Sequence, residues 1–238
     1  MGKRKKIDGV LLLDKPAGIS SNQALQQARW LYQAEKAGHG GTLDPFATGL
    51  LPVLFGEASK FGRYFLDGDK AYEATLAFGT ETDTGDLSGA VIREAAPPPL
   101  DAVDWVALCA RFSGVQRQVP PVYSALKVGG ERAYALARRG ELPQLEAREV
   151  VIHELRFLGM DGDGARFFVR CSKGTYIRSL LRDMAAALGS AGHTHALRRV
   201  AVAGLTAMTP LATLRAWQEA GDMAALQALL LPLDCCVA

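Results

Sequence analysis

The sequence has little cysteine, no apolar run long enough to cross a membrane, and no strong excess of charge of either sign. Its four cysteines form no C-x-x-C pair and have no histidine at zinc-ligand spacing, so we expect reduced thiols rather than disulfides or a zinc site. The apolar run at residues 10–13 is too short for a signal peptide or a membrane span. These absences favour a cytoplasmic protein that does not enter a membrane.

Several common motifs are also missing. There is no internal repeat, no low-complexity tract, and no Walker-type or dinucleotide-binding glycine motif. The polar segment at residues 79–86 lacks the ligand spacing of an EF-hand, which argues against calcium. His193 and His195 have no carboxylate or cysteine at a useful spacing, so we predict no metal site.

What is present describes an ordinary globular protein. Hydrophobic residues make up 49% of the 238 residues, charged residues make up 22%, and the formal net charge is +2. Basic residues nevertheless gather at residues 3–6 and again in a later segment that holds Lys127, Arg132, Arg138, Arg139 and Arg148. Basic clusters attract phosphates, but a charge run is more often a solvated surface, so alone they favour RNA only weakly.

The most informative stretch is GHGGTLDPFATGLLPVLFGEASK, residues 38–60. It sets one carboxylate, Asp44, between a glycine-rich approach and Pro45, which disfavours a helical conformation at Asp44. We predict that Asp44 and His39 share a shaped loop, which the apolar residues 50–55 anchor to the core. Without the apolar residues that follow it, the Asp44-Pro45 pair would indicate only a simple turn.

This stretch resembles the catalytic signature of the TruB family, the bacterial tRNA pseudouridine-55 synthases, which isomerise a uridine in the T arm of tRNA. The usual signature has Thr after the histidine, so Gly40 is a departure from it. A second match is CSKGTYIRSLLR, residues 171–182. The resemblance extends over roughly residues 8–235, nearly the whole chain.

Periodicity predicts the elements that carry these motifs. We expect strands over residues 10–13, 70–78, 150–158 and 166–171, the last two forming a hairpin. We expect helices over residues 20–32, 57–66, 101–112, 131–139 and 223–231, and one that begins near Tyr176. The residues between 79 and 86 are expected to form a loop.

The resemblance assigns roles to individual residues. It implies that Asp44 is the nucleophile, that Tyr72 lies beneath the target base, and that Arg178 pairs with Asp44. It also implies substrate contacts at His39, Lys15, Tyr176, Leu197 and Lys60. His39 would brace the space that the extruded base vacates.

The resemblance further implies an α+β fold, with a mixed, largely antiparallel central sheet flanked by helices. We expect a single catalytic domain over residues 1–238. An RNA-gripping thumb at residues 118–148 would contact phosphates through Lys127, Arg132, Arg138 and Arg139. Relatives often continue into a small RNA-binding domain of the PUA-like type, which we expect to be absent.

We therefore predict a monomeric tRNA pseudouridine synthase without a cofactor, because breaking and rejoining a glycosidic bond needs no redox step, phosphate donor or metal. Whether Asp44 attacks C1′, removes a sugar proton to give a glycal, or adds to C6 of the base stays open. One alternative is a catalytically silent tRNA-binding or RNA-folding module. A glycoside hydrolase ranks last, since no second acid accompanies Asp44 in a motif.

Overall fold

The computed structural model describes residues 4–124, 126–141 and 143–236. The chain divides into two compact units, with residues up to Tyr72 and from Arg198 in unit 1, and Glu73–Leu197 in unit 2. Each unit is described separately below. Among the residues that the structure describes, none of the helices combines the length and the apolar character that a bilayer crossing requires.

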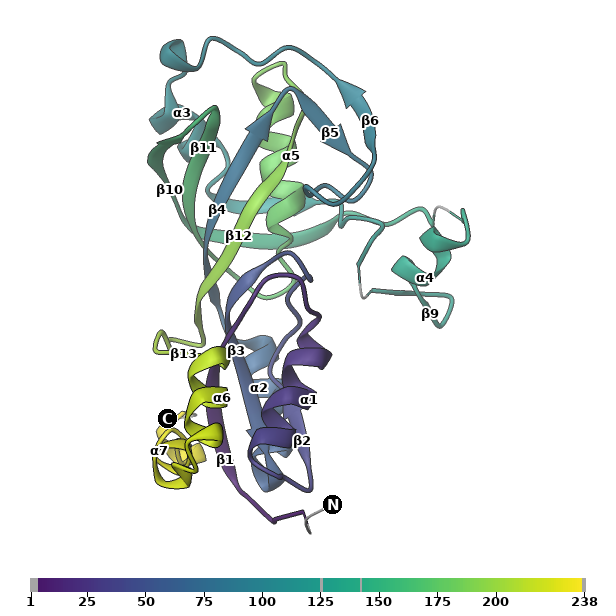
Figure 1. Cartoon of the computed structure of the whole chain (residues 1–238). Coiled ribbons are helices and arrows are strands. Elements are labelled where there is room, and N and C mark those ends of the chain that lie inside the picture. Colours follow the sequence, from purple (N-terminus) through teal and green to yellow (C-terminus); the bar gives the residue numbers. More distant parts are fainter. Residues whose placement is uncertain (1–3, 125, 142, 237–238) are drawn as a thin grey trace. The chain divides into compact units, whose positions relative to one another are not determined.

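Among its described residues, unit 1 contains the long strands β1 and β3, the short strands β2 and β13, and helices on both sides (Figure 1). Its elements are β1 (Gly9–Lys15), α1 (Ser21–Leu31), β2 (Ala37–His39), β3 (Thr48–Phe55), η1 (Gly56–Phe61), α2 (Gly62–Asp67), β13 (Thr209–Pro210), α6 (Leu211–Glu219), α7 (Met223–Ala228) and η3 (Leu233–Cys235). The strands β4 (Lys70–Phe78) and β12 (Gly192–Val202) run through both units.

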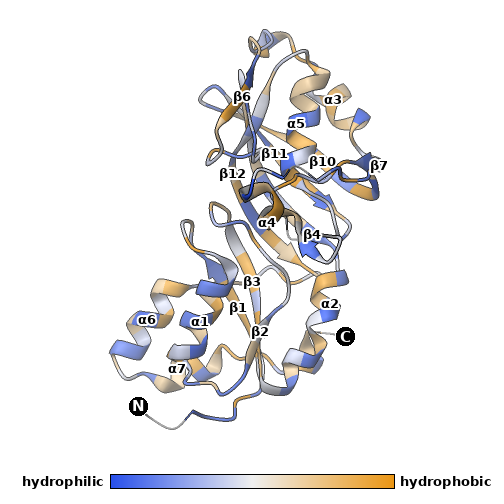
Figure 2. Ribbon diagram, turned by 90° about the vertical axis from the view of Figure 1, so that its right-hand side faces the viewer, coloured by the Kyte–Doolittle hydropathy of each residue, from blue (hydrophilic) through white to orange (hydrophobic). Residues whose placement is uncertain are grey.

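The apolar runs at residues 10–13 and 50–55 form β1 and β3, which are buried on both faces. Leu11 and Leu13 face α1 and α6, whereas Val10 and Leu12 face the other side with Phe65 of α2. In Figure 2, β1 and β3 carry hydrophobic segments, and the helices α1 and α6 beside them carry hydrophilic residues. Burial on both faces explains why these strands read as continuous apolar runs instead of alternating ones.

Unit 2 consists of a twisted sheet with α5 and α3 against it (Figure 1). Its elements are β5 (Thr80–Thr82), β6 (Val91–Glu94), η2 (Leu100–Ala102), α3 (Trp105–Arg111), β7 (Gly114–Gln118), β8 (Lys127–Val128), β9 (Glu131–Arg132), α4 (Ala133–Arg138), β10 (Arg148–Asp161), β11 (Gly164–Cys171) and α5 (Ile177–Ala187). Trp105 stacks on Phe157 with 4.5 Å between ring centroids, which ties α3 to the β10–β11 hairpin.

The strand order is β13-β1-β3-β12 in unit 1, with β2 beside β3, and β12-β4-β11-β10-β7 in unit 2. The pairs β1–β3, β2–β3, β10–β11 and β7–β10 are antiparallel, whereas β1–β13 and β3–β12 are parallel. The predicted α+β class with a mixed, largely antiparallel sheet is confirmed. Whether the two units act as one catalytic domain stays a prediction.

Four predicted helices were too long. In the helix expected over residues 57–66, the first part is the 3-10 helix η1, so α2 begins only at Gly62. Asp104 caps α3 by accepting a hydrogen bond from Ala107 N (2.9 Å), so that helix begins at Trp105 rather than residue 101. At the C-terminal end α7 stops at Ala228, because Leu231 forms a backbone bridge with Val10. The helix expected from residue 131 begins two residues later, after β9.

Two further expectations need correction. Residues 80–82 of the expected loop form β5, which pairs with β6. His39 is the last residue of β2 and not part of the loop, since it pairs with Val53 of β3. The ring of His39 is therefore positioned by a strand, which holds it more firmly than a loop would.

Candidate functional site

Asp44 lies, as predicted, in the loop between β2 and β3, and is half-buried. The loop closes locally, because Ala47 N–H donates to the carbonyl oxygen of Asp44 (3.1 Å). At Pro45, the residue after Asp44, the carbonyl oxygen accepts a hydrogen bond from Gly18 N–H (2.8 Å). The turn after β1 thus supports the loop directly beside the carboxylate.

Ser21, the first residue of α1, fixes the residue before Asp44. Leu43 N–H donates to Ser21 Oγ (2.8 Å), and the same hydroxyl donates to Leu43 O (3.0 Å). Both residues are buried, so each of these bonds replaces a hydrogen bond that the group would otherwise make to water. Leu43 therefore cannot shift without breaking two buried hydrogen bonds.

Arg199, in β12, binds the backbone of the loop that carries Asp44, and its side chain is only 1% exposed. Its Nε donates to Leu50 O (2.8 Å), Nη1 donates to Thr42 O (3.3 Å), and Nη2 donates to Gly41 O (3.2 Å). One planar guanidinium thus bonds carbonyl groups on both sides of Asp44 in the sequence. A lysine could not reproduce this fork of donors.

The parallel pairing of β12 with β3 brings Arg199 to this place, opposite Gly49. Gly49 has φ +103°, and a Cβ atom there would lie 2.2 Å from the carbonyl oxygen of Arg199, so only glycine fits. The neighbouring Arg198 projects to the other face, where it binds both carboxylate oxygens of Asp14 at 3.0 and 2.7 Å. Adjacent arginines on one strand thereby serve different partners.

Lys15 ends β1 and its side chain is fully buried. Its Nζ donates to the carbonyl oxygens of Pro16 and Ile19, each at 2.8 Å, and to that of Pro45 at 3.3 Å. The lysine therefore joins the end of β1 to the residue that follows Asp44. The predicted contact of Lys15 with the substrate stays a prediction.

Burial lowers the pKa of Lys15 to about 8, with the charge of Asp44 opposing this shift and that of Arg199 adding to it. At neutral pH the ammonium group is therefore still mostly charged. A positive charge near Asp44 favours the ionised carboxylate, which is the form that can act as a nucleophile.

Tyr72 is half-buried in β4 and shares a side-chain hydrogen bond with Arg199. Burial lowers the pKa of Arg199, and the Tyr72 phenol opposes that shift through its charge and this hydrogen bond. Arg199 therefore connects the predicted catalytic tyrosine with the loop that carries Asp44.

His39 has its Nδ1 atom buried, and that atom has no hydrogen-bond partner among the residues that the structure describes. Burial lowers the pKa of His39, and the positive charge of Arg199 lowers it further, so the ring is neutral at pH 7. The departure at Gly40 has a steric reason here. A Cβ atom at that position would lie 2.5 Å from Cβ of Phe65, which occupies the space of a side chain at position 40.

In unit 2, Arg178 lies in the first turn of α5, as predicted, and is 4% exposed. Its Nη1 donates to Thr84 O (2.6 Å) and lies 3.6 Å from Asp86 Oδ2, while Nη2 donates to Tyr123 O (2.9 Å). The segment around Asp86, which the sequence suggested only as a polar loop, therefore supports this arginine. The pairing of Arg178 with Asp44 stays a prediction.

The other predicted substrate contacts occupy varied environments. The backbone of Tyr176 is fixed by the Gln118 amide, which accepts from Tyr176 N (2.8 Å) and donates to Tyr176 O (3.0 Å). Leu197 is buried in β12, and Lys60 is exposed in η1, where it pairs with Glu57. None of these three roles is tested by the geometry.

In the predicted thumb, Arg139 is exposed and pairs with Glu131 (2.6 Å) and Glu141 (3.2 Å). A phosphate would therefore have to displace these acids. The side chains of Lys127, Arg132 and Arg138 lie outside the described residues.

The structure thus brings Lys15, Tyr72 and the Asp44 loop together around Arg199, and it places His39 within the field of that arginine. Sequence reasoning missed Arg199. The available signal was the Arg198-Arg199 pair in an alternating strand, which puts one of the two side chains on a buried face. Within residues 4–124, 126–141 and 143–236, no three His, Cys, Asp or Glu side chains gather as a metal site would require.

Comparison with known families finds two adjoining matches. The family described as "TruB family pseudouridylate synthase (N terminal domain)" matches residues 29–177. The "tRNA pseudouridylate synthase B C-terminal domain" family matches residues 178–238. Together these two matches extend from residue 29 to the last residue of the chain.

Individual relatives agree with these matches. The chain is 48% identical over 233 residues to "tRNA pseudouridine synthase B" of Ectopseudomonas mendocina, covering 97% of this chain and 76% of that protein. It is 53% identical over 234 residues to the protein of the same name from Chromobacterium violaceum, covering 97% of this chain and 74% of that protein. A solved structure titled "Crystal Structure of a Cbf5-Nop10-Gar1 Complex" is similar with a TM-score of 0.72 and 26% identity, over 94% of this chain and 60% of that one.

Proposed function

The chain belongs to the TruB family of tRNA pseudouridine synthases, which are isomerases, and from this premise we propose that it converts the uridine at position 55, in the T arm of tRNA, into pseudouridine. The observation that carries the proposal is the buried hydrogen-bond network around Asp44. Arg199, Ser21 and Lys15 hold the loop on both sides of this carboxylate. A loop held so closely suits preorganised chemistry more than simple binding.

The reaction balances without an external reactant. The bond between C1′ of the sugar and N1 of the base breaks, the base turns, and a bond forms between C1′ and C5. The proton leaves C5, N1 gains a proton, and the carboxylate of Asp44 is regenerated. The site must therefore supply a nucleophile, a pocket that excludes water, and a route for one proton.

Asp44 supplies the nucleophile in this proposal. A half-buried carboxylate tends to hold its proton because desolvation disfavours the charge, so a nearby cation is needed. Lys15 provides one positive charge, and we propose that Arg178 provides a second by pairing with Asp44. The first step by which Asp44 acts stays open among attack at C1′, glycal formation and addition at C6.

The target base must leave its stack, which costs a few kcal/mol. We propose that Tyr72 and Leu197 contact the two faces of the extruded base. The hydrogen bond between Tyr72 and Arg199 would stabilise the phenolate form of Tyr72, which can accept the C5 proton and become neutral. His39, which is neutral and has an unpartnered Nδ1, would accept or donate one hydrogen bond where the base has left.

The remaining contacts extend the binding surface. We propose that Tyr176 and Lys60 contact the substrate beside the base. Phosphates of the T arm would be contacted by the thumb residues Lys127, Arg132, Arg138 and Arg139, and the protein would act as a monomer in the cytoplasm, where tRNA is modified.

The decisive experiment measures tritium release from C5-labelled uridine in a T-arm stem-loop. Asp44→Asn keeps the size of the side chain but removes the nucleophile, so we expect the rate to fall by more than about a thousandfold. The dissociation constant for the same RNA should change by less than about threefold. Asp101→Asn, at an exposed acid in η2, is the matched control and should behave as wild type.

Two outcomes would contradict the proposal. If the wild-type protein binds the stem-loop but releases no tritium, the chain is a silent tRNA-binding module. If Asp44→Asn releases tritium at the wild-type rate, another group performs the chemistry.

A further inference from the structure

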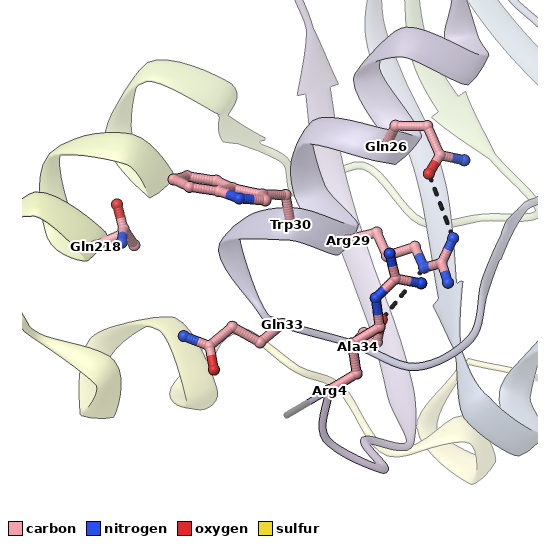
Figure 3. A pocket seen from close by; sticks show the side chains of 7 residues that line it. All are labelled: Arg4, Gln26, Arg29, Trp30, Gln33, Ala34 and Gln218. Atoms are coloured by element: carbon pink, nitrogen blue, oxygen red, sulfur yellow. Dashed lines mark hydrogen bonds between the residues drawn. The ribbon is translucent and has the colours of Figure 1, made fainter. Parts of the chain in front are cut away.

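Trp30, near the C-terminal end of α1, is 69% exposed although tryptophan is usually well buried. Two hollows of about 630 and 540 Å³ adjoin it, and Gln26, Trp30 and Gln218 line both of them. Figure 3 shows the indole extending from α1 toward Gln218 of α6. Both hollows lie within unit 1.

Two arginines and no acid are among the described residues that line the larger hollow, whereas Arg215 and Glu219 both line the smaller one. Arg4 precedes Lys5, whose backbone is held against residues 33–35. Lys5 N–H donates to Gln33 O (2.8 Å), and Glu35 N–H donates to Lys5 O (2.9 Å). These bonds bring the guanidinium of Arg4 to the same hollow as that of Arg29 (Figure 3).

Arg29 is held in place by the backbone. Its Nε donates to Ala34 O (3.2 Å), Nη2 donates to Glu35 O (2.7 Å), and Nη1 reaches Gln26 Oε1 at 3.5 Å. Neutral carbonyl groups fix the guanidinium without neutralising its charge. Such an immobilised cation is suited to bind an anion without further loss of side-chain entropy.

Gln33 adds an unusual backbone conformation. The end of α1 forms a Schellman motif, in which Gln33 N–H donates to Trp30 O and Ala34 N–H donates to Arg29 O, each at 2.9 Å. Gln33 occupies the left-handed position with φ 54°, where glycine is preferred. Its amide group lies at the hollow together with that of Gln218 (Figure 3).

We propose that this surface binds a nucleotide of the RNA substrate, with the base stacked on Trp30 and its phosphate at Arg4 and Arg29. An aromatic face combined with basic groups is how proteins bind unpaired nucleotides. The two glutamine amides supply donors and acceptors for the edge of a base.

An RNA fits better than a protein partner. The larger hollow combines two guanidinium groups with Trp30 and the apolar stems of its glutamine and arginine side chains, so one surface offers a cationic site for a phosphate and an aromatic face for a base. The nucleotide is not the target uridine. Ser21 contacts the Asp44 loop, and Trp30 follows nine residues later along α1, which corresponds to about 14 Å.

The test compares a full-length unmodified tRNA transcript with the T-arm stem-loop. We expect Trp30→Ala to raise the dissociation constant for the transcript about tenfold, within the range for loss of one stacked base, and Trp30→Phe to retain most of the affinity. Arg4→Gln should lower the slope of log affinity against log salt by about 1. The rate of tritium release at saturating RNA should be unchanged in all three variants.

The controls are two exposed residues of unit 2. Val106→Ala removes an apolar side chain that is 81% exposed, and Arg156→Gln removes an exposed charge, so neither should change the affinity. The RNA comparison separates the sources of an effect. A loss seen with both RNAs places the nucleotide in the T arm, and a loss seen only with the transcript places it elsewhere in the tRNA.

Two results would overturn the inference. One is wild-type affinity of Trp30→Ala and Arg4→Gln for both RNAs. The other is a concentration-dependent dimer of the wild-type protein that Trp30→Ala abolishes, which would assign the surface to a second copy of the chain. The inference takes from the proposed function only that the ligand is RNA, so an enzyme that proves inactive would still give a readable binding result.

Discussion

Arg199 in unit 1 and Arg178 in unit 2 are both almost inaccessible to solvent but have different partners. Arg199 donates to three backbone carbonyl groups of the Asp44 loop and its flank. Arg178 donates to two backbone carbonyl groups and also lies 3.6 Å from the carboxylate of Asp86. Arg199 therefore acts mainly on the shape of a loop, whereas Arg178 already has an acidic neighbour with which its charge is shared.

This difference shows that a buried guanidinium does not have one function. Bonds to carbonyl groups leave the positive charge of Arg199 uncancelled. Burial is the main cause of the lowered pKa values of Lys15 and His39, and the charge of Arg199 adds to both shifts. If Arg178 also pairs with Asp44, the two carboxylates at positions 44 and 86 must share one cation. Substitutions can distinguish the positioning of the Asp44 loop by Arg199 from a pairing of Arg178 with Asp44.

Among the substitutions that compare the two arginines, Arg199→Lys should have the largest effect. The ammonium group can replace one or two of the three carbonyl bonds, which leaves at least one buried carbonyl unsatisfied at about 1–3 kcal/mol. We expect a loss of that size in the free energy of unfolding and a fall in kcat of about a thousandfold, because the loop around Asp44 would relax. Urea denaturation and tritium release measure the two quantities.

Retention of kcat in Arg199→Lys, with stability reduced, would show that the shape of the loop is not limiting for catalysis. Arg198→Lys is the matched control on the same strand. It should lose the bidentate bond to Asp14 but leave the loop intact.

Arg178→Lys should give the next largest effect. It keeps the charge but loses the planar fork, so we expect kcat to fall about a hundredfold while the fold survives. Asp86→Asn sharpens the comparison, since it removes the acid that shares Arg178. Activity lost in Arg178→Lys but kept in Asp86→Asn would support a role toward Asp44. Wild-type kcat in Arg178→Lys would remove that role.

Lys15 gives a pH-dependent effect of about tenfold. Since its pKa in the folded protein is about 8, the ammonium charge near Asp44 is lost as the pH rises through 8, and kcat should fall on that limb. Lys15→Met should be slower at pH 7 and lack the limb. An identical alkaline limb in the variant would assign it to another group.

The lowered pKa of Lys15 affects stability in the opposite direction to kcat: stability increases as the pH rises. The folded protein releases the Lys15 proton near pH 8 and the unfolded chain near 10.5, so the unfolded state binds more protons between these values. The contribution of this group to stability therefore rises across that window, by on the order of 3 kcal/mol. The unfolding free energy of the wild type should therefore rise relative to that of Lys15→Met as the pH increases from 8 to 10.5.

The smallest effect on activity should come from Gly40→Thr, which restores the residue of the usual signature. The added Cβ atom would meet Phe65, so we expect a loss of about 1–3 kcal/mol in stability with kcat changed less than fivefold. Phe65→Leu keeps both the Cβ and the Cγ atom that the new side chain would meet, so it should not recover the loss, whereas Phe65→Ala, which removes Cγ, should recover part of it. Wild-type thermal stability of Gly40→Thr would show that the backbone around Phe65 shifts without cost.

The sequence predicted the elements that carry local signals. Ser20 caps α1 in a capping box, and β4 has the predicted boundaries, because capping and period-two alternation are short-range patterns. The loop position of Asp44 followed from its glycines and Pro45. These features need no knowledge of distant residues.

What the sequence did not predict depends on contacts across the chain. Arg199 reaches the Asp44 loop only because β12 pairs in parallel with β3, roughly 150 residues apart in sequence. The end of α7 is set by the bridge from Leu231 to Val10. The acid beside Arg178 is Asp86, which belongs to a segment that the sequence pattern predicted only as a polar loop. Each of these depends on tertiary pairing that local propensity does not encode.

The absence of a side chain at Gly49 has a consequence for how this scaffold can change. Even one methyl group there would wedge β3 away from β12, since its carbon would fall 2.2 Å from an oxygen of the opposite backbone. The guanidinium would then move out of reach of the carbonyl groups it holds, and the catalytic carboxylate would lose its support without itself being altered. Directed evolution of this protein should therefore find substitutions on the surface of the loop long before it finds any at this crossing point.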